Sequence, residues 1–410
     1  MSRAQSETAV AVWGGVTFGL LLASYSAFRP VRDSLITGGD PEQLPWLFTL
    51  TFVAVSVVSP LWGAAVAKSP RRVVPLAFHA FALCLAGFFA VTRANVAPIT
   101  VGRVFYVWSA VFNLFVVSVF WSLLADLLGP GIARTLYGPI AAGGTVGTFV
   151  GPLLTKVLLG TIGVAGVLMM SALLLELAVL GVAQVRRAAR DLEASAEQQD
   201  PPVEGGALDG LKHVVRSPYL AAIVGYVLCT ACAATFVYLA QARIVHDTLA
   251  DRAARTDFFA TIDLVVAAVT FGVQLAAAGP LIRWLGPGIV LCVLPLVQGV
   301  GIAVLAGAPS LTVLAIIMVA GKSATHGLTR PARELLFTVI PRADKYRAKN
   351  VIDTMVYRLG DFGSSWLDRG LDAAGGGVLA IAALPLSAIW LGLAVILGVG
   401  FRRRATLEQT

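Results

Sequence analysis

Charged side chains gather between Gly321 and Gly360, in a stretch whose flanks are apolar enough to lie in a lipid bilayer. Each such charge costs roughly 2.5–3.5 kcal/mol at the centre of a spanning helix, so it is kept only where it binds a ligand in an interior cavity or pairs with another charge. On a helix, residues three or four apart share a face. The first segment places five residues on one such face: Lys322, His326, Arg330, Arg333 and Glu334. The excess of cations on this face predicts a polar path for an anionic solute.

The two ends of this face have different interpretations. Lys322 and Arg330 lie deeper in the predicted span, and we expect them to contact the ligand or couple to its movement. Arg333 and Glu334 lie near its end, where a network of ion pairs at a gate explains them equally well. Pro331 is expected to kink the helix and to release a backbone carbonyl.

The following segment repeats the pattern with acidic residues. Asp353 and Asp361 share a stripe with Tyr357, and Arg358 stands beside it. We expect the two carboxylates to balance cations of the preceding helix, and Arg358 is a candidate ligand contact. Removing one partner of such a buried pair strands a charge, which is costly.

A second cationic group ends the first apolar segment. Arg29 and Arg32 share a helical face with Tyr25, and Asp33 follows them. Two guanidinium groups could bind a phosphate or carboxylate. Alternatively, they extend to the membrane surface and pair with Asp33.

The composition places the whole chain in a membrane. Of its 410 residues 57% are hydrophobic and only 13% are charged, about half the charged fraction of a soluble domain. The net charge of +8 is explained by loops on one side of the membrane, and we expect no nucleic-acid partner. No nucleophile, metal-ligand cluster or complete phosphate-binding loop is present, so we expect neither an enzyme nor a cofactor.

Twelve apolar segments approach the roughly 20 residues that a spanning helix needs. They lie at about 9–28, 46–67, 73–92, 99–126, 136–160, 162–185, 219–243, 256–278, 288–307, 311–338, 350–371 and 378–400. A polar stretch at 186–217 predicts a linker between an N-terminal six-helix half (1–185) and a C-terminal half (218–410). Lysine and arginine gather in the loops on one side, which places both termini and the linker in the cytoplasm. Gly143, Gly147 and Gly151 predict a face for close helix approach.

The halves resemble repeats of one another. Arg29, Arg32 and Asp33 align at one constant offset with Arg243, His246 and Asp247. An even number of spans separates the equivalents, which makes the repeats parallel, as in major facilitator transporters. Arg243 therefore joins the candidate anion contacts, and Asp247 joins the candidate charge-balancing residues. The alternative is coincidence among apolar helices of similar composition.

Several motifs together resemble the ATP/ADP translocase family, the nucleotide transporters of obligate intracellular bacteria and plastids. They are Phe28-Arg-Pro-Val-Arg-Asp-Ser-Leu, Phe120-Trp-Ser, Gly321-Lys-Ser-Ala, Pro331-Ala-Arg-Glu, Lys349-Asn-Val-Ile-Asp and Arg358-Leu-Gly. The resemblance implies twelve helices of major facilitator type and exchange of nucleotides or a related anion. It also implies functional roles for the residues at the family's charged positions: Arg32, Lys322, Arg333, Glu334, Lys349, Asp353 and Arg358.

The chain departs from this family at three places. Arg32 stands where the family has a lysine, and a region near Ser109 and the position of Tyr238 lack the family's glutamates. Two other functions remain open: a proton-coupled carrier that titrates Glu334, Asp353 or His326, and a non-transporting receptor on the same scaffold.

The sequence therefore predicts a polytopic, monomeric transporter of a bacterial inner membrane. Its partners are the lipid bilayer and a small anionic solute. The candidate anion contacts are Arg29, Arg32, Arg243, Lys322, Arg330 and Arg358. The candidate gate or charge-balancing residues are Asp33, Asp247, Arg333, Glu334, Lys349, Asp353 and Asp361.

Overall fold

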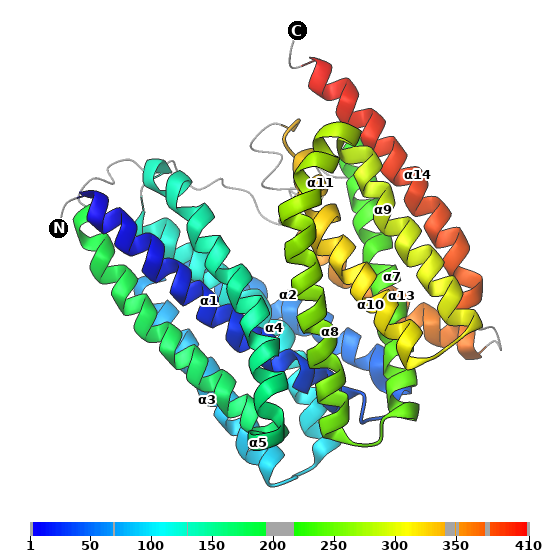
Figure 1. Cartoon of the computed structure of the whole chain (residues 1–410), viewed down its shortest axis with the longest axis horizontal. Coiled ribbons are helices and arrows are strands. Elements are labelled where there is room, and N and C mark those ends of the chain that lie inside the picture. The colour runs from blue at the N-terminus through cyan, green and yellow to red at the C-terminus, as the bar shows by residue number, and fades with distance from the viewer. Residues whose placement is uncertain are drawn as a thin grey trace. The chain divides into compact units, whose positions relative to one another are not determined.

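The computed structural model describes residues 3–68, 70–128, 130–193, 217–340, 349, 352–373 and 378–407. Every regular element in these ranges is helical (Figure 1). The first half of the chain contains α1 (Arg3–Ile36), the 3-10 turn η1 (Pro41–Gln43), α2 (Leu44–Lys68), α3 (Pro70–Arg93), α4 (Pro98–Leu127) and α5 (Pro130–Glu193). The second half contains α7 (Pro218–Thr248), α8 (Arg252–Val273), α9 (Gly279–Gly307), α10 (Leu311–Ala324), α11 (Arg330–Leu336), α13 (Tyr357–Ala373) and α14 (Val378–Leu407). Three π-helical segments adjoin these helices: η2 (Gln274–Ala278), η3 (Thr325–Thr329) and η4 (Ile352–Val356).

Nine helical stretches of the described chain are long and apolar enough to cross a membrane. Two of them, Thr135–Arg190 and Arg252–Gly307, have 56 residues each. A straight helix of that length would measure about 84 Å, far more than the roughly 30 Å of a bilayer core. Each is broken by a glycine with positive φ, Gly163 at 65° and Gly286 at 78°, and so contains two successive helices. The predicted all-helical membrane fold is confirmed.

The helix α13, which carries several charged residues, is not among those nine stretches. It has 17 residues, and charged side chains interrupt its apolar character. They are Arg358, Asp361, Asp368, Arg369 and Asp372. Its place in the chain matches the predicted eleventh segment, and its charges face other helices of the same compact unit, as described below.

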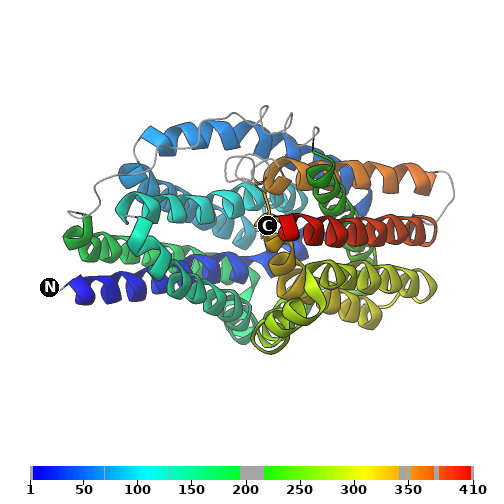
Figure 2. The same ribbon diagram turned by 90° about the horizontal axis from the view of Figure 1, so that it is seen from above.

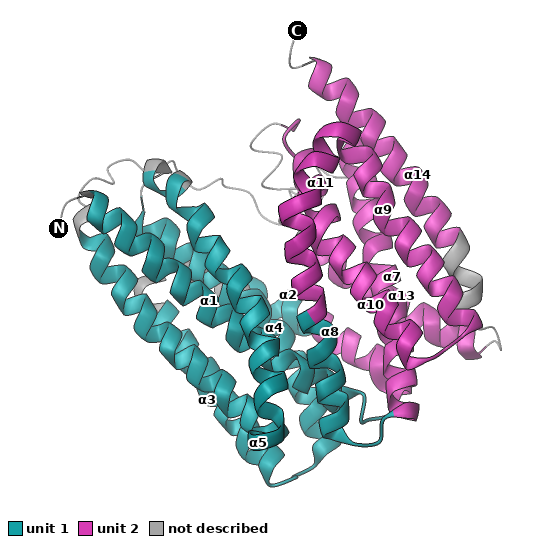
Figure 3. Ribbon diagram, viewed as in Figure 1, with its two compact units in different colours: residues 1–39, 53–201, 249–264 teal, residues 40–52, 202–248, 265–410 magenta. Residues whose placement is uncertain are grey.

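The chain forms two compact units (Figure 3). Unit 1 contains Met1–Gly39, Val53–Pro201 and Leu249–Leu264, and unit 2 contains Asp40–Phe52, Pro202–Thr248 and Val265–Thr410. Unit 1 thus includes the first part of α8, and unit 2 includes the first part of α2. The predicted boundaries at 185 and 218 remain a prediction, since most of the predicted linker (194–216) lies outside the described residues.

Contacts with α13 explain why Asp40–Phe52 belongs to unit 2. The Trp46 ring packs edge-on against Trp366 of α13, with their centroids 4.9 Å apart. The Trp366 indole nitrogen donates a hydrogen bond to the Thr49 hydroxyl at 3.0 Å. The Arg369 side chain also donates to the carbonyl of Glu42 at 3.1 Å. These contacts attach the start of α2 to α13.

In unit 1, α1 packs against α5; the two ribbons lie close together in the view from above (Figure 2). Glycines bring their backbones into contact. A Cβ atom added to Gly143 or Gly147 would lie 2.1 Å from the carbonyl oxygen of Gly15 or Gly19. Such a separation excludes any side chain larger than hydrogen. The predicted small-residue face is confirmed, and it fixes α1 against its neighbour.

Aromatic rings hold the far part of α1, where Arg29 and Arg32 lie. Phe28 is fully buried and packs against three rings of α4, those of Phe105, Trp108 and Phe112, with centroid distances of 5.2–5.8 Å. Their size and their tilted or edge-to-face packing make this a stiff platform. The platform limits the positions that the neighbouring arginines can adopt.

Because α1 and α5 approach so closely, we expect even one added methyl group at their contact to lower the stability of the fold. Gly147→Ala should lower the stability by about 1–3 kcal/mol or more, because its methyl group would overlap the backbone of Gly19. Gly138→Ala on the same helix is the matched control, since no atom lies within 4 Å of its added Cβ. Thermal unfolding of the purified variants in detergent measures both. Equal melting temperatures for G147A and the wild type would contradict this packing.

Candidate functional site

Arg29 forms a buried ion pair inside unit 1. Its Nε donates to Oδ2 of Asp263 on α8 at 2.7 Å. The Asp263 side chain is only 2% exposed, whereas Arg29 keeps 25% of its side-chain surface exposed. No other described residue accepts a hydrogen bond from Arg29. The two terminal nitrogens of this guanidinium group therefore retain donors that can bind an anion.

Arg32 lies about one helical turn beyond Arg29 and has a different environment. Its Nε and Nη2 donate to Oδ1 of Asp33 at 2.9 and 2.7 Å. Its guanidinium carbon lies 5.5 Å from the centre of the Tyr106 ring on α4. Asp33 is buried and so neutralises Arg32 at short range. The two arginines of this motif are thus held by different acids.

A buried arginine on α8 also contacts the end of α1. Arg255 donates through Nε to the carbonyl of Ser34 at 3.1 Å, and through Nη1 to the carbonyls of Leu249 and Ala250. A cation is favourable here because the last turn of a helix presents unpaired carbonyls. Thr256 adds a hydroxyl contact to Ser34 at 2.8 Å.

The sequence analysis missed Asp263 and Arg255 as site residues. The available signal for Asp263 was a lone carboxylate inside an apolar segment, which a membrane protein keeps only for a reason. Nothing in the sequence identifies Arg29 as its partner, because 234 residues separate the two.

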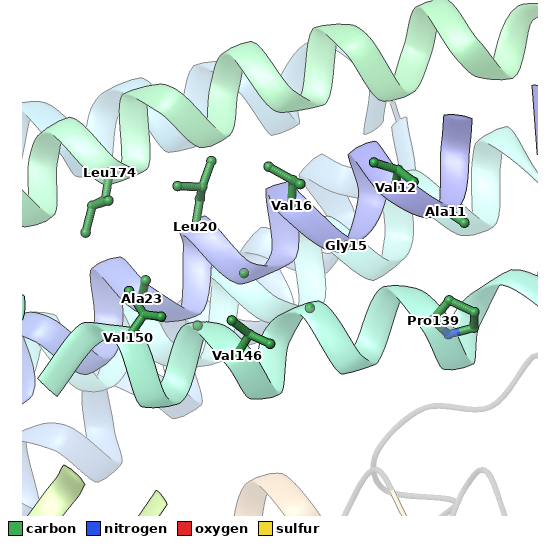
Figure 4. Close-up of a pocket in the computed structure, with 13 residues that line it drawn as sticks. Ala11, Val12, Gly15, Val16, Leu20, Ala23, Pro139, Val146, Val150 and Leu174 are labelled. Carbon is green, nitrogen blue, oxygen red and sulfur yellow. The ribbon is translucent and has the colours of Figure 1, made fainter. Parts of the chain in front are cut away.

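A cavity of about 540 Å³ lies beside α1 but does not contain these charges (Figure 4). Its walls come from α1 and α5 and are apolar, with Val12, Val16, Val146 and Val150 among them. It offers no side-chain donor that could orient an anion. The charged cluster, rather than this cavity, is the candidate solute site.

Unit 2 contains the predicted stripe at Lys322, but not on one regular helix. The α-helix gives way to the π-helical segment η3 (Thr325–Thr329) before Pro331. The extra residue in this turn rotates the later positions away from the face that a regular α-helix predicts. Lys322 is half-buried, and Arg330 is exposed at the start of α11.

The π-helical segment accounts for the carbonyl that Pro331 releases. The Arg330 amide donates to the carbonyl of Thr325, five residues back, so Pro331 would leave the carbonyl of His326 without a donor. Gln274 of η2 donates its side-chain amide to that carbonyl at 3.1 Å. The carbonyl that Pro331 leaves without a backbone donor therefore accepts a hydrogen bond from a side chain instead.

Three ion pairs follow in unit 2. Lys349 lies 2.6 Å from Glu334, and Arg333 approaches the same carboxylate at 3.8 Å. Arg358 lies 3.3 Å from Asp361, which also accepts a hydrogen bond from Thr235 at 3.0 Å. The side chain of Asp353 lies outside the described residues. The charge-balancing roles of Glu334, Lys349 and Asp361 and the anion-binding role of Arg358 stay predictions.

Arg243 is paired with two acids of α13. Its Nη2 contacts Asp368, and it lies 2.5 Å from Asp372. The other side-chain oxygen of Asp368 is buried without a hydrogen-bond partner among the described residues. Asp247 is exposed near the end of α7. The aligned motif of the second half thus has a different electrostatic environment from that of Arg29.

Three solved structures resemble this chain over nearly its full length. A point mutant of the nucleoside transporter NupG is 13% identical, with a TM-score of 0.65, covering 96% of this chain and 99% of that one. A bacterial homologue of the iron transporter ferroportin is 14% identical, with a TM-score of 0.61 and coverages of 98% and 99%. A bacterial homologue of the human lysosomal transporter Spinster is 14% identical, with a TM-score of 0.59 and coverages of 98% and 95%. At these identities the likeness shows the fold alone.

Among curated protein sequences, none matches this chain. The family model of the Major Facilitator Superfamily, in contrast, matches residues 11–340. This match spans most of the chain, and it agrees with the described helices and with the solved structures. The chain therefore belongs to the Major Facilitator Superfamily and is a secondary transporter, not an enzyme.

Proposed function

We propose that this transporter carries a small organic anion, and that its solute binds at Arg29 and Arg32. The observation that carries the proposal is the state of Arg29. It lies within the predicted span of α1 and has one described acidic partner, while a quarter of its side chain stays exposed. A charge in this position is costly unless it serves a function, and an anion is the ligand that a guanidinium group binds best.

Nucleotides are the proposed class of anion. The support is the motif resemblance to the ATP/ADP translocases, which is strongest over 321–360 and includes the Arg29–Asp33 motif. A planar guanidinium fork suits phosphate oxygens well. A region near Ser109 and the position of Tyr238 lack the family's glutamates, so a related organic anion fits the same cations. The likeness to the nucleoside transporter NupG adds no support for this class, because at 13% identity it shows the fold alone.

The described ion pairs of unit 2 support the roles that we propose there. Glu334 with Lys349 and Asp361 with Arg358 are pairs that could break and re-form as helices move. We assign Lys322, Arg330, Arg358 and Arg243 to the solute path. Arg333 and the remaining acids, including Asp247 and Asp353, balance charge or form gates. The transporter works by alternating access, in a bacterial inner membrane, as a monomer with both termini in the cytoplasm.

Proton-coupled transport is a second candidate function. The observation that favours it is the cluster in which Asp368 and Asp372 share the guanidinium group of Arg243. Two carboxylates beside one cation leave an excess negative charge, which a proton can neutralise. Exchange and proton coupling make opposite predictions for transport assays.

Loss of either arginine at the end of α1 should abolish tight anion binding. Each charge-assisted contact contributes about 1.5–3 kcal/mol, so Arg29→Ala or Arg32→Ala should weaken ATP binding by roughly 10- to 100-fold. Titration of purified protein with ATP, other nucleotides and carboxylates measures this. Lys322→Ala should have a similar effect.

Arg93→Ala is the control for these variants. Arg93 is an exposed cation at the end of α3, remote in sequence from the motif. All variants must first elute at the wild-type volume from a size-exclusion column in detergent. Wild-type affinity in both R29A and R32A would refute the assignment of the anion site.

Exchange and proton coupling can be separated in liposomes. We expect internal ADP to accelerate uptake of labelled ATP, because a carrier that changes state only when loaded must return with a second solute. An imposed proton gradient should leave the rate unchanged. Uptake that follows the proton gradient and ignores internal ADP would favour the Arg243 cluster as the coupling site.

A further inference from the structure

Two π-helical segments of unit 2 pack against each other. The segment η2 follows the end of α8, and η3 lies between α10 and α11. The side-chain amide of Gln274 in η2 donates a hydrogen bond to the carbonyl of His326 in η3 at 3.1 Å. A Cβ atom added to Gly327 would lie 2.8 Å from Cγ1 of Val273, the last residue of α8. The backbone of η3 therefore packs directly against the junction of α8 and η2.

The hydrogen bond from Gln274 favours the π-helical form of η3 over a regular α-helical turn. In the π-helical form the Arg330 amide donates to the carbonyl of Thr325, five residues back. In an α-helical turn the same amide would donate to the carbonyl of His326, four residues back. The π-helical form thus takes the Arg330 amide away from the His326 carbonyl, which is costly inside a membrane unless another donor replaces it. Gln274 supplies a donor and so lowers the free energy of the π-helical form.

The form of η3 sets the direction of the charged residues that follow it. A π-helical turn of this kind contains one more residue than an α-helical turn. Conversion to the α-helical form would rotate Arg330 and the rest of α11 by about 100° relative to Lys322, the angle that one residue covers on an α-helix. Arg330 is exposed and Ala332 is fully buried. The rotation would turn Ala332 out of the packed interior and point Arg330 in another direction.

We propose that Gln274 is a positioning residue of the solute path, which holds η3 in its π-helical form and so keeps Arg330 in the direction, relative to Lys322, in which both contact the anion. This inference rests on the proposed function, which assigns Lys322 and Arg330 to that path. Gln274 need not contact the solute itself. It acts through its hydrogen bond to the backbone of a neighbouring helix.

A buried cysteine after the turn reports the form of η3. The natural cysteines are first replaced: Cys84, Cys229, Cys232 and Cys292. Ala332→Cys should then react slowly with a thiol reagent, because Ala332 is fully buried. Gln274→Leu should raise this labelling rate about 2- to 10-fold, since the loss of one hydrogen bond shifts an equilibrium by about that factor. Gln274→Glu should raise it too, because an ionised carboxylate has a similar shape but no donor.

Two controls separate a change of the turn from a general loosening of unit 2. Met318→Cys replaces a buried residue of α10 that precedes the turn, and its labelling should stay slow in every variant. Leu275→Ala changes the neighbour of Gln274 in η2, whose side chain is 77% exposed, and should leave the labelling of Ala332→Cys unchanged. Equal acceleration at Met318→Cys and Ala332→Cys would indicate general loosening and would overturn the inference.

Added ATP tests the link between the turn and the solute. If the anion contacts Lys322 and Arg330 together only in the π-helical form, bound ATP must stabilise that form, because the coupling between two equilibria is reciprocal. Saturating ATP should therefore slow the labelling of Ala332→Cys in Gln274→Leu toward the rate seen with Gln274 in place. Because the assay follows a rate, it detects the α-helical form even where the π-helical form predominates.

The outcomes separate the inference from the proposed function. Failure of ATP and the other anions to bind the wild type would overturn the proposed function. Labelling of Ala332→Cys that neither Gln274→Leu nor Gln274→Glu accelerates would overturn the inference, whether or not ATP binds. If ATP binds the wild type but leaves the accelerated labelling in Gln274→Leu unchanged, the inference alone is overturned, because the turn then has no influence on the solute.

Discussion

A guanidinium group inside a bilayer must have a partner, and this requirement organises the charged part of the molecule. Arg29 meets it with Asp263, and Arg32 meets it with Asp33 and the face of Tyr106. Because each partner neutralises its arginine only at short range, the helices that carry them must be in register. Ion pairing therefore determines the position of α8 against α1 in unit 1 as much as side-chain packing does.

The contacts of α1 with α5 and α4 in unit 1 are tightly packed. Glycines bring α1 against α5 at backbone distance, and the aromatic rings around Phe28 hold its far part against α4. Neither contact can loosen without opening voids in a close-packed interior. The α1–α8 contact, in contrast, consists of hydrogen bonds and an ion pair between buried polar groups.

Hydropathy was sufficient to predict the helical membrane fold, since spanning segments must satisfy their backbone hydrogen bonds internally. Small-residue spacing likewise identified the α5 face that meets α1. The partners of Arg29 and Arg243 could not be predicted, because Asp263 and Asp368 come from sequence-distant helices and carry no motif. The predicted register past Lys322 also failed at η3, where Pro331 favours a π-helical turn over a regular one.

The most direct test of this account is an experimental structure with ATP bound. We predict phosphate oxygens within hydrogen-bond distance of Arg29 and Arg32. Density for ATP elsewhere would contradict the account. In that case the solute site would have to be sought among the cations of α10, α11 and α13.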